Sequence, residues 1–254
     1  RLVTMSMRNT LIVLCLLLIG SGTAQALSKN GFRLDNALIP PEEIFSGGPP
    51  RDGIPAIDKP RFIEADKADR LRGGERILGL SLNGISKAYP LAIMNWHEIV
   101  NDRFGPDTVA VTYCPLCGTG MAFEAKLKGR NLSFGVSGLL YNSDVLLYDR
   151  ETESLWSQLD RLAVTGSFKG TRLQSIPLEH TTWRDWYQRH PDTLVLSRET
   201  GHFRDYDHTP YAGYETSDDI YFPVSFRSEG FHPKERVLGV DCLLYTSPSP
   251  RDRY

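Results

Sequence analysis

Two cysteines separated by two residues offer the most readily identified chemistry in this sequence. Cys114 and Cys117 stand in the stretch YCPLCGTGM, Tyr113–Met121. Such a pair can form a structural disulfide, cycle between dithiol and disulfide, or supply two thiolate ligands to a metal ion. The residue types alone leave all three uses open.

The surroundings of the pair weigh these uses. A disulfide across so short a loop would stabilise the fold little, because its entropic effect grows with loop length. A closed zinc site needs four ligands, and the chain has no second such pair before Asp241. Gly118 stands where a c-type haem motif needs histidine. The run Gly118-Thr119-Gly120 favours a tight loop over a thioredoxin-like helix, so thiolate activation has to come from another group.

Two nearby residues, His97 and Met121, could act together with the cysteines. An imidazole could stabilise a thiolate, although the same histidine could simply bond a backbone carbonyl. A thioether from Met121 would complete a set of Cys, His and Met ligands, which suits copper(I). Met121 also fits the interior face of a strand.

The elements that must position these residues are mostly strands. Asn83-Gly84 between two alternating runs predicts a hairpin with a type I′ turn. The apolar spacing of Leu91–Phe104 predicts an amphipathic helix, and TTWRDWYQRHP, Thr181–Pro191, predicts a second helix capped by Thr181 or Thr182. The remaining strands are predicted at Thr108–Tyr113, Met121–Lys128, Asn131–Gly138, Asp144–Tyr148 and Leu194–Ser197. We therefore expect an α+β fold, a single β-rich domain with two short-to-medium helices packed on the sheet.

The two ends differ in character from the middle. Residues 1–26 contain a basic start, the apolar run LIVLCLLLIG and Ala24-Gln25-Ala26, which together predict a cleaved signal peptide with an upstream extension. The run is too short to span a bilayer, so we expect no stable membrane span after cleavage and a periplasmic or extracellular location. Residues 27–72 predict an irregular lead-in rich in Pro and Gly.

The C-terminal region suggests truncation. The segment GGERILGLSLNGISKAYP, Gly73–Pro90, is echoed by PKERVLGV, Pro233–Val240, and the echo stops before its second strand. A strand is expected at Glu235–Val240, paired as Glu75–Leu80 is. Residues 241–254 are interpreted as a non-native tail that packs against nothing, with Cys242 far from the cysteine pair.

Four blocks of the sequence resemble the DUF3179 family, secreted or envelope proteins of unknown function. They are AIMNWHEIVNDRFG, VAVTYCPLCGTGMAF, FGVSGLLYNSDVLLYDRETESLWSQL and TTWRDWYQRHPDTLVLS. The resemblance spans Asn36 to Val240 and implies that residues 73–240 form a DUF3179-like domain. Some members of the family are selenoproteins, which implies redox chemistry for the cysteine motif. The family pattern is lost at Asp241.

The resemblance also marks individual positions. The matched residues are His97, Glu98, Asn101 and Asp102 in the first block, Cys114 and Cys117 in the second, and Asn142, Asp149, Thr152, Trp156 and Gln158 in the third. Within the third block, Asp149 could cap a turn, and Trp156 and Gln158 share one face of a short strand. These three residues could line a pocket or fill the edge of a core.

The charge balance gives no hint of nucleic-acid or anionic-membrane binding. The 29 basic and 31 acidic residues leave only a mild negative balance. The residues leave three hypotheses for the function.

The first is a thiol–disulfide redox protein, a thiol oxidoreductase, in which Cys114 attacks a partner protein. In this hypothesis Cys117 resolves the mixed disulfide and His97 stabilises the thiolate. The second is a copper(I)-binding or copper-delivery module with Cys114, Cys117, His97 and Met121 as ligands. The third is a non-catalytic recognition module around Trp156.

Overall fold

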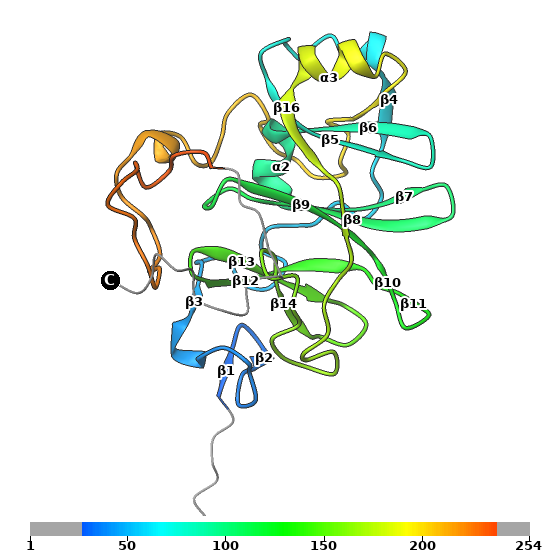
Figure 1. The fold of residues 1–254 in the computed structure, drawn as a ribbon. Coiled ribbons are helices and arrows are strands. Elements are labelled where there is room, and N and C mark those ends of the chain that lie inside the picture. The colour runs from blue at the N-terminus through cyan, green and yellow to red at the C-terminus, as the bar shows by residue number, and fades with distance from the viewer. Residues whose placement is uncertain (1–26, 238–254) are drawn as a thin grey trace, which may run out of the picture.

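Runs of β-branched and aromatic residues form the strands of this chain, which make up 36% of residues 27–237 and pair mostly antiparallel. The computed structural model describes residues 27–237 and contains three main sheets within that range (Figure 1). Helices α2, Leu91–His97, and α3, Trp183–Arg189, pack against these sheets. The predicted fold class, α+β and β-rich with two helices on the sheets, is confirmed for this part of the chain.

The first sheet joins one hairpin to strands from distant parts of the chain, whereas the second contains three strands that are consecutive in the sequence. One sheet has the order β16-β5-β6-β17-β4, with strands Glu179–Thr182, Arg76–Leu82, Ile85–Pro90, Leu194–Leu196 and Phe62–Glu64. The second has the order β15-β9-β8-β7, with strands Ser175–Ile176, Thr119–Glu124, Asp107–Cys114 and Ile99–Phe104. The cysteine motif therefore lies between two neighbouring strands of the second sheet.

The third sheet has the order β14-β13-β12-β3, with strands Leu155–Ser157, Asp144–Asp149, Phe134–Tyr141 and Ile44–Ser46. Two small ribbons complete the described strands, β1-β2 at Ser28–Lys29 and Phe32–Arg33, and β10-β11 at Lys126–Leu127 and Arg130–Asn131. Short 3-10 turns occupy Pro41–Glu43, Ala65–Lys67 and Tyr214–Thr216. The lead-in from residue 27 to 72 thus contributes edge strands to two sheets.

Two local predictions are confirmed in detail. Asn83 and Gly84 have φ angles of 54° and 73°, as a type I′ turn requires, and they connect β5 to β6. Helix α3 begins after Thr182, whose hydroxyl accepts the Asp185 N–H at 3.3 Å. A side-chain oxygen at this position satisfies a backbone donor that the helix itself cannot satisfy.

The helix predicted over Leu91–Phe104 is wrong in its second half. Helix α2 ends at His97, because Glu98 adopts the left-handed conformation with φ 58°, and Ile99–Phe104 then forms β7 paired with β8. Val100 and Phe104 fit both a helical stripe and one face of a strand. The residue between them on that face is Asp102, a buried acid that hides the alternation typical of a strand.

The expected strand at Glu235–Val240 is absent from its described part, Glu235–Val237. In its sheet, β5 itself pairs with β16 on one side and with β6 on the other. The predictions for residues 1–26, for residues 238–240 and for the tail at 241–254, including Cys242, fall outside the described residues.

A buried ion pair joins the first sheet to the second. The Lys87 ammonium on β6 donates to both carboxylate oxygens of Asp102 on β7 at 2.9 Å, and the Tyr89 hydroxyl donates to Asp102 at 2.6 Å. The two charged side chains are only 8% and 5% exposed. This cross-sheet contact explains why Asp102 faces the interior.

Removing one partner of this pair is expected to destabilise the fold strongly. Asp102→Ala should lower the free energy of unfolding by about 3–5 kcal/mol, because Lys87 would remain buried without a counter-charge. Glu64→Gln is the control, since it breaks the exposed Lys67–Glu64 pair and should cost less than about 1 kcal/mol. Urea unfolding midpoints measure both. Equal midpoints for the two variants would contradict this assignment.

Candidate functional site

The Cys-Pro-Leu-Cys motif forms the connection between two antiparallel strands. Cys114 ends β8 and pairs with Thr119, the first residue of β9, so the motif is a tight hairpin loop. Gly118 has φ 65°, a conformation that residues with a side chain rarely adopt. The predicted loop geometry is therefore confirmed: strands, not a helix, flank the motif on both sides.

The two cysteines differ in exposure. Cys114 is 1% exposed, whereas Cys117 is half-buried, and both are free thiols. The Cys117 thiol donates to Asp144 Oδ1 at 3.4 Å, and the Cys114 thiol lies 3.8 Å from the Ser143 carbonyl oxygen. The two sulfurs and a carboxylate oxygen of Asp144 all lie within 4.8 Å of one another. The loop thus brings together two thiols and one acid.

Asp144, at the start of β13, is the acid of this group. It is 4% exposed, and its Oδ2 accepts the Leu159 N–H at 3.1 Å. Burial raises the pKa of Asp144 to about 6, against smaller opposing effects of its hydrogen bonds from Leu159 and Cys117. A carboxyl group with this pKa can both accept and release a proton near neutral pH.

Glu98 is a second buried acid near the thiols. Burial raises the pKa of Glu98 to about 7; the hydrogen bond from the Tyr211 hydroxyl, at 3.3 Å, lowers it, and repulsion from Asp144 raises it further. Burial also raises the pKa of the Cys114 thiol, and the nearby Cys117, Asp144 and Glu98 add to this effect. Cys114 is therefore held in its neutral thiol form.

An apolar cavity of about 460 Å³ adjoins the loop. Leu116, between the two cysteines, forms part of its wall, and Glu98 is the one Asp, Glu, Lys, Arg or His among the described residues that line it. The other wall residues include Val145, Leu140, Tyr211 and Phe222. A cavity of this size and polarity fits an uncharged apolar group.

His97 does not lie with the cysteines. Its Nδ1 is 2.7 Å from the Pro55 carbonyl oxygen, and its Nε2 is 2.6 Å from the Tyr206 hydroxyl. Because burial lowers the pKa of His97 to about 4, the ring is neutral, so Nδ1 donates to the carbonyl and Nε2 accepts from the hydroxyl. Both nitrogens are occupied, which leaves His97 a structural role between α2 and the lead-in.

Met121 lies on β9 opposite Thr112 and packs, half-buried, against the core cluster that contains Cys114. This position matches the interior strand face that its sequence context also allowed. The structure gives it hydrophobic packing beside the site.

The three residues considered for a pocket lie in the core. Asp149, Trp156 and Gln158 are all 0% exposed. Trp156 donates from Nε1 to Asp149 at 2.9 Å, and Asp149 also accepts the Thr152 N–H at 2.7 Å, as a turn-capping carboxylate does. Gln158 Nε2 donates to the Thr112 hydroxyl at 2.8 Å, beneath the hairpin that ends in the cysteine loop. Gln158 thus supports that hairpin, whereas Asp149 and Trp156 stabilise the turn after β13.

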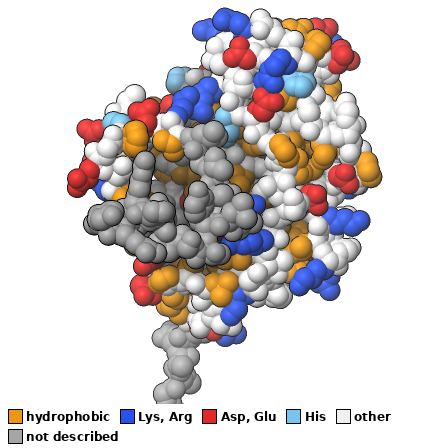
Figure 2. Space-filling view, in the orientation of Figure 1, with side chains coloured by type: hydrophobic (Ala, Val, Ile, Leu, Met, Phe, Trp, Pro, Cys, Tyr) orange, Lys and Arg blue, Asp and Glu red, His pale blue; other side chains and the backbone are white. Residues whose placement is uncertain are grey.

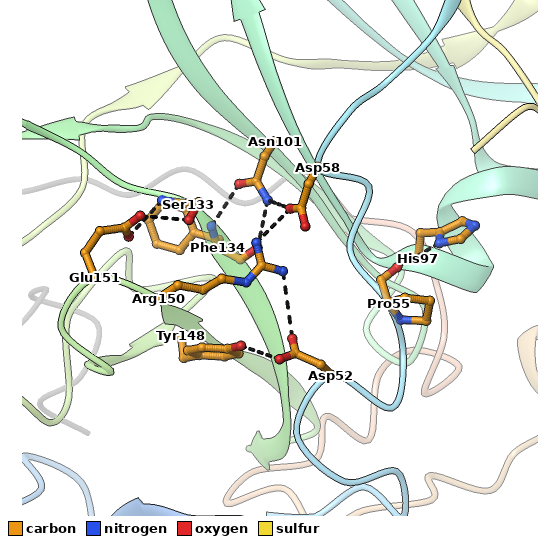
Figure 3. A network of polar contacts seen from close by, with 10 residues as sticks. All are labelled: Asp52, Pro55, Asp58, His97, Asn101, Ser133, Phe134, Tyr148, Arg150 and Glu151. Atoms are coloured by element: carbon orange, nitrogen blue, oxygen red, sulfur yellow. Dashed lines mark hydrogen bonds and ion pairs between the residues drawn. The ribbon is translucent and has the colours of Figure 1, made fainter. Parts of the chain in front are cut away.

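A polar network holds the lead-in against the two sheets next to the site (Figure 3). The Arg150 guanidinium lies 2.7 Å from Asp58, and Asn101 donates to the same carboxylate at 2.7 Å. Asn101 also accepts the Phe134 N–H at 2.8 Å, which links β7 to β12. Asn101, one of the residues matched by the family resemblance, thus connects the second sheet to the third.

Sequence reasoning missed Asp144 and Glu98 as members of the site. One signal was present, since Asp144 follows Asn142-Ser143 and opens the apolar run VLLY. An acid at the start of a buried strand needs a partner, but the sequence does not tell which partner it meets. Glu98 was identified only because its position lies in a block of sequence that resembles the DUF3179 family.

Comparison with known proteins yields one match. The family model described as "Protein of unknown function (DUF3179)" matches residues 51–247. No curated protein and no solved structure matches the chain. Within residues 27–237, none of the helices has the length and apolar character needed to cross a membrane.

The difference in exposure predicts an order of modification. Iodoacetamide should alkylate Cys117 at least about tenfold faster than Cys114 in the folded protein, because Cys114 is buried and its thiolate is disfavoured. Peptide mass spectrometry after short reaction times measures both sites. In urea the two rates should converge, which serves as the control. Faster modification of Cys114 in the folded state would contradict the described burial.

Glu98 should make stability depend on pH. The folded protein holds the Glu98 proton up to about pH 7, whereas the pKa is 4.5 without burial, so the free energy of unfolding falls as pH rises between these values. Glu98→Gln stays neutral at both pH values. Between pH 4.5 and pH 8, the free energy of unfolding of the variant should therefore rise by up to about 3 kcal/mol relative to that of the parent. Urea unfolding across this range measures the gain. Glu124→Gln, at an exposed position, should show no such trend.

Proposed function

The chain belongs to the DUF3179 family, whose function is unknown, and on that premise we propose that it is an exported thiol–disulfide oxidoreductase. The observation that supports this proposal is the group of two free thiols and one buried carboxyl whose reactive atoms lie within 4.8 Å of one another. The signal peptide expected in residues 1–26 supports an oxidising compartment, in which a disulfide can form and persist.

Burial favours the opposite order of attack to the one expected from sequence. Cys117 is half-buried and hydrogen-bonded to Asp144, so it is the thiol that a substrate can reach. Cys114 is buried and its pKa is raised, so it suits the resolving role, protected until a mixed disulfide forms beside it. We therefore assign Cys117 as the nucleophile and Cys114 as the resolving thiol.

The reaction proceeds in two exchanges. The Asp144 carboxylate accepts the Cys117 proton, and the thiolate attacks one sulfur of a substrate disulfide, which breaks the S–S bond and releases one substrate thiolate. Asp144 returns the proton to that leaving thiolate. Cys114 then loses its proton and attacks Cys117 Sγ, which forms the Cys114–Cys117 disulfide and releases the second substrate thiolate, to which that proton passes. The protein pair loses two electrons and two protons, and the substrate disulfide gains them.

The adjoining cavity supports an uncharged apolar group on the substrate. Leu116 lies between the two cysteines and forms part of the cavity wall, so a group bound there would sit beside the loop. Glu98, with a pKa of about 7, can remain neutral in this wall, which keeps the wall suited to an uncharged group. An apolar disulfide is therefore the substrate class that this geometry supports best.

A metal site is the second candidate, because the same three donor atoms are close enough to share one ion. The copper(I) set expected from sequence included His97, but both of its ring nitrogens already have other partners. The residues that could hold a metal are Cys114, Cys117 and Asp144, of which the two thiolates suit copper(I) and the carboxylate suits zinc better. A recognition face built on Trp156 finds no support, since that side chain is fully buried.

Reaction with 2,2′-dithiodipyridine tests the redox proposal. In a chain with Cys15→Ser and Cys242→Ser, the pair should release about two pyridinethiones per protein and end as a disulfide. Cys114→Ser should release about one and keep a mixed disulfide, whereas Cys117→Ser should react slowly. Asp144→Asn should slow the first release by roughly 10²-fold and should lose the rise in rate that the parent shows near pH 6, where the carboxylate ionises.

Three results would oppose the proposal. The first is release of about one thione by the parent protein, which would mean that the pair cannot close. The second is a Cys114–Cys117 pair that cannot be cycled between dithiol and disulfide in mixtures of reduced and oxidised dithiothreitol. The third is a stoichiometric metal in the protein purified from copper- or zinc-supplemented cells that is lost in Cys117→Ser and blocks the reaction, which would favour the metal site.

A further inference from the structure

A second cavity, of about 520 Å³, has a lining opposite in character to the first. It shares no lining residue with the apolar cavity and lies where the start of β5, helix α2 and residues 206–209 meet. Four arginines line it, Arg70, Arg72 and Arg76 from one segment and Arg198 from another, together with His208. Over the face of the molecule shown in Figure 2, by contrast, positive and negative side chains are interspersed.

The acids in the wall leave most of this positive charge unpaired. Asp207 pairs with Arg198 at 2.6 Å. The Glu75 carboxylate accepts the backbone N–H of Arg72 at 3.2 Å. Within residues 27–237, the guanidinium groups of Arg70, Arg72 and Arg76 have no carboxylate at ion-pair distance.

Arg76 is the most informative of the three. Its side chain is half-buried, and burial lowers its pKa, with repulsion from Arg236 as the next cause. Attraction to Tyr113 and Glu215 offsets only part of this effect. A partly desolvated cation without a paired anion is unfavourable for folding alone, because it loses hydration and gains no counter-charge. An anion bound in the cavity would supply that counter-charge.

We propose that this cavity binds a small multivalent oxyanion through the guanidinium groups of Arg70, Arg72 and Arg76. The planar guanidinium matches the spacing of two oxygens in a phosphate or carboxylate group. Several unpaired guanidiniums at one cavity favour a ligand with more than one negative group, such as a polyphosphate or a polycarboxylate. The cavity volume lies within the range of small-molecule sites.

Titration calorimetry with the full chain tests the site. Pyrophosphate and citrate are the two probes, each at constant ionic strength maintained with sodium chloride, since screening would otherwise mask the effect. At least one probe should bind with saturation, and the preferred probe identifies phosphate or carboxylate as the anion class. Arg76→Gln, and separately Arg70→Gln with Arg72→Gln, should weaken that binding by about tenfold or more.

Arg130→Gln is the matched control, because Arg130 is exposed on β11 and lies outside the cavity. It should leave the affinity unchanged. Urea unfolding without ligand checks that each variant folds, and the exposed Arg70 and Arg72 allow the test even if Arg76→Gln proves unstable. The proposal is overturned if neither probe binds with saturation, or if Arg130→Gln weakens binding as much as the cavity variants do.

Discussion

The left-handed conformation of Glu98 is the constraint on which the arrangement of the site depends. Its backbone N–H closes helix α2 on Met94, and its carbonyl oxygen accepts the Tyr113 N–H at 2.7 Å. This single residue therefore ends the helix, starts β7 and fixes the strand that delivers Cys114. A residue with a side chain adopts this conformation at a cost of roughly 1–2 kcal/mol, and the same turn places a carboxyl group in the wall of the apolar cavity.

Low polarity gives the cysteine loop its chemical character. Asp144, Glu98 and Cys114 are each buried, and burial raises the pKa of each; the pKa values of Asp144 and Glu98 lie near neutral pH, whereas Cys114 stays a neutral thiol. The half-buried Cys117 connects this group to the outside. The arginine-lined cavity has the opposite character, with positive charge retained and no described acid to neutralise most of it. Within the described residues, the chain thus has two cavities of opposite polarity.

The sequence predicted the fold better than the site. Strand alternation and the Asn83-Gly84 turn depend on near neighbours, and both were correctly predicted. The region after His97 was not, since Asp102 occupies an interior position whose justification is Lys87 on another strand. His97 was placed with the cysteines because it precedes their strand. In the structure, its ring instead bonds Pro55 and Tyr206, which are distant in sequence.

By itself, the sequence determined the β-rich α+β class, the capped helix α3 and the loop geometry of the cysteine motif. These features follow from side-chain periodicity and from the backbone preferences of glycine, asparagine and threonine, which act over a few residues. Only the tertiary structure decided that Asp144 faces Cys117, that Cys114 is buried and that Arg198 joins Arg70, Arg72 and Arg76 in one cavity. Burial and charge proximity arise between segments far apart in the chain, so no local pattern specifies them.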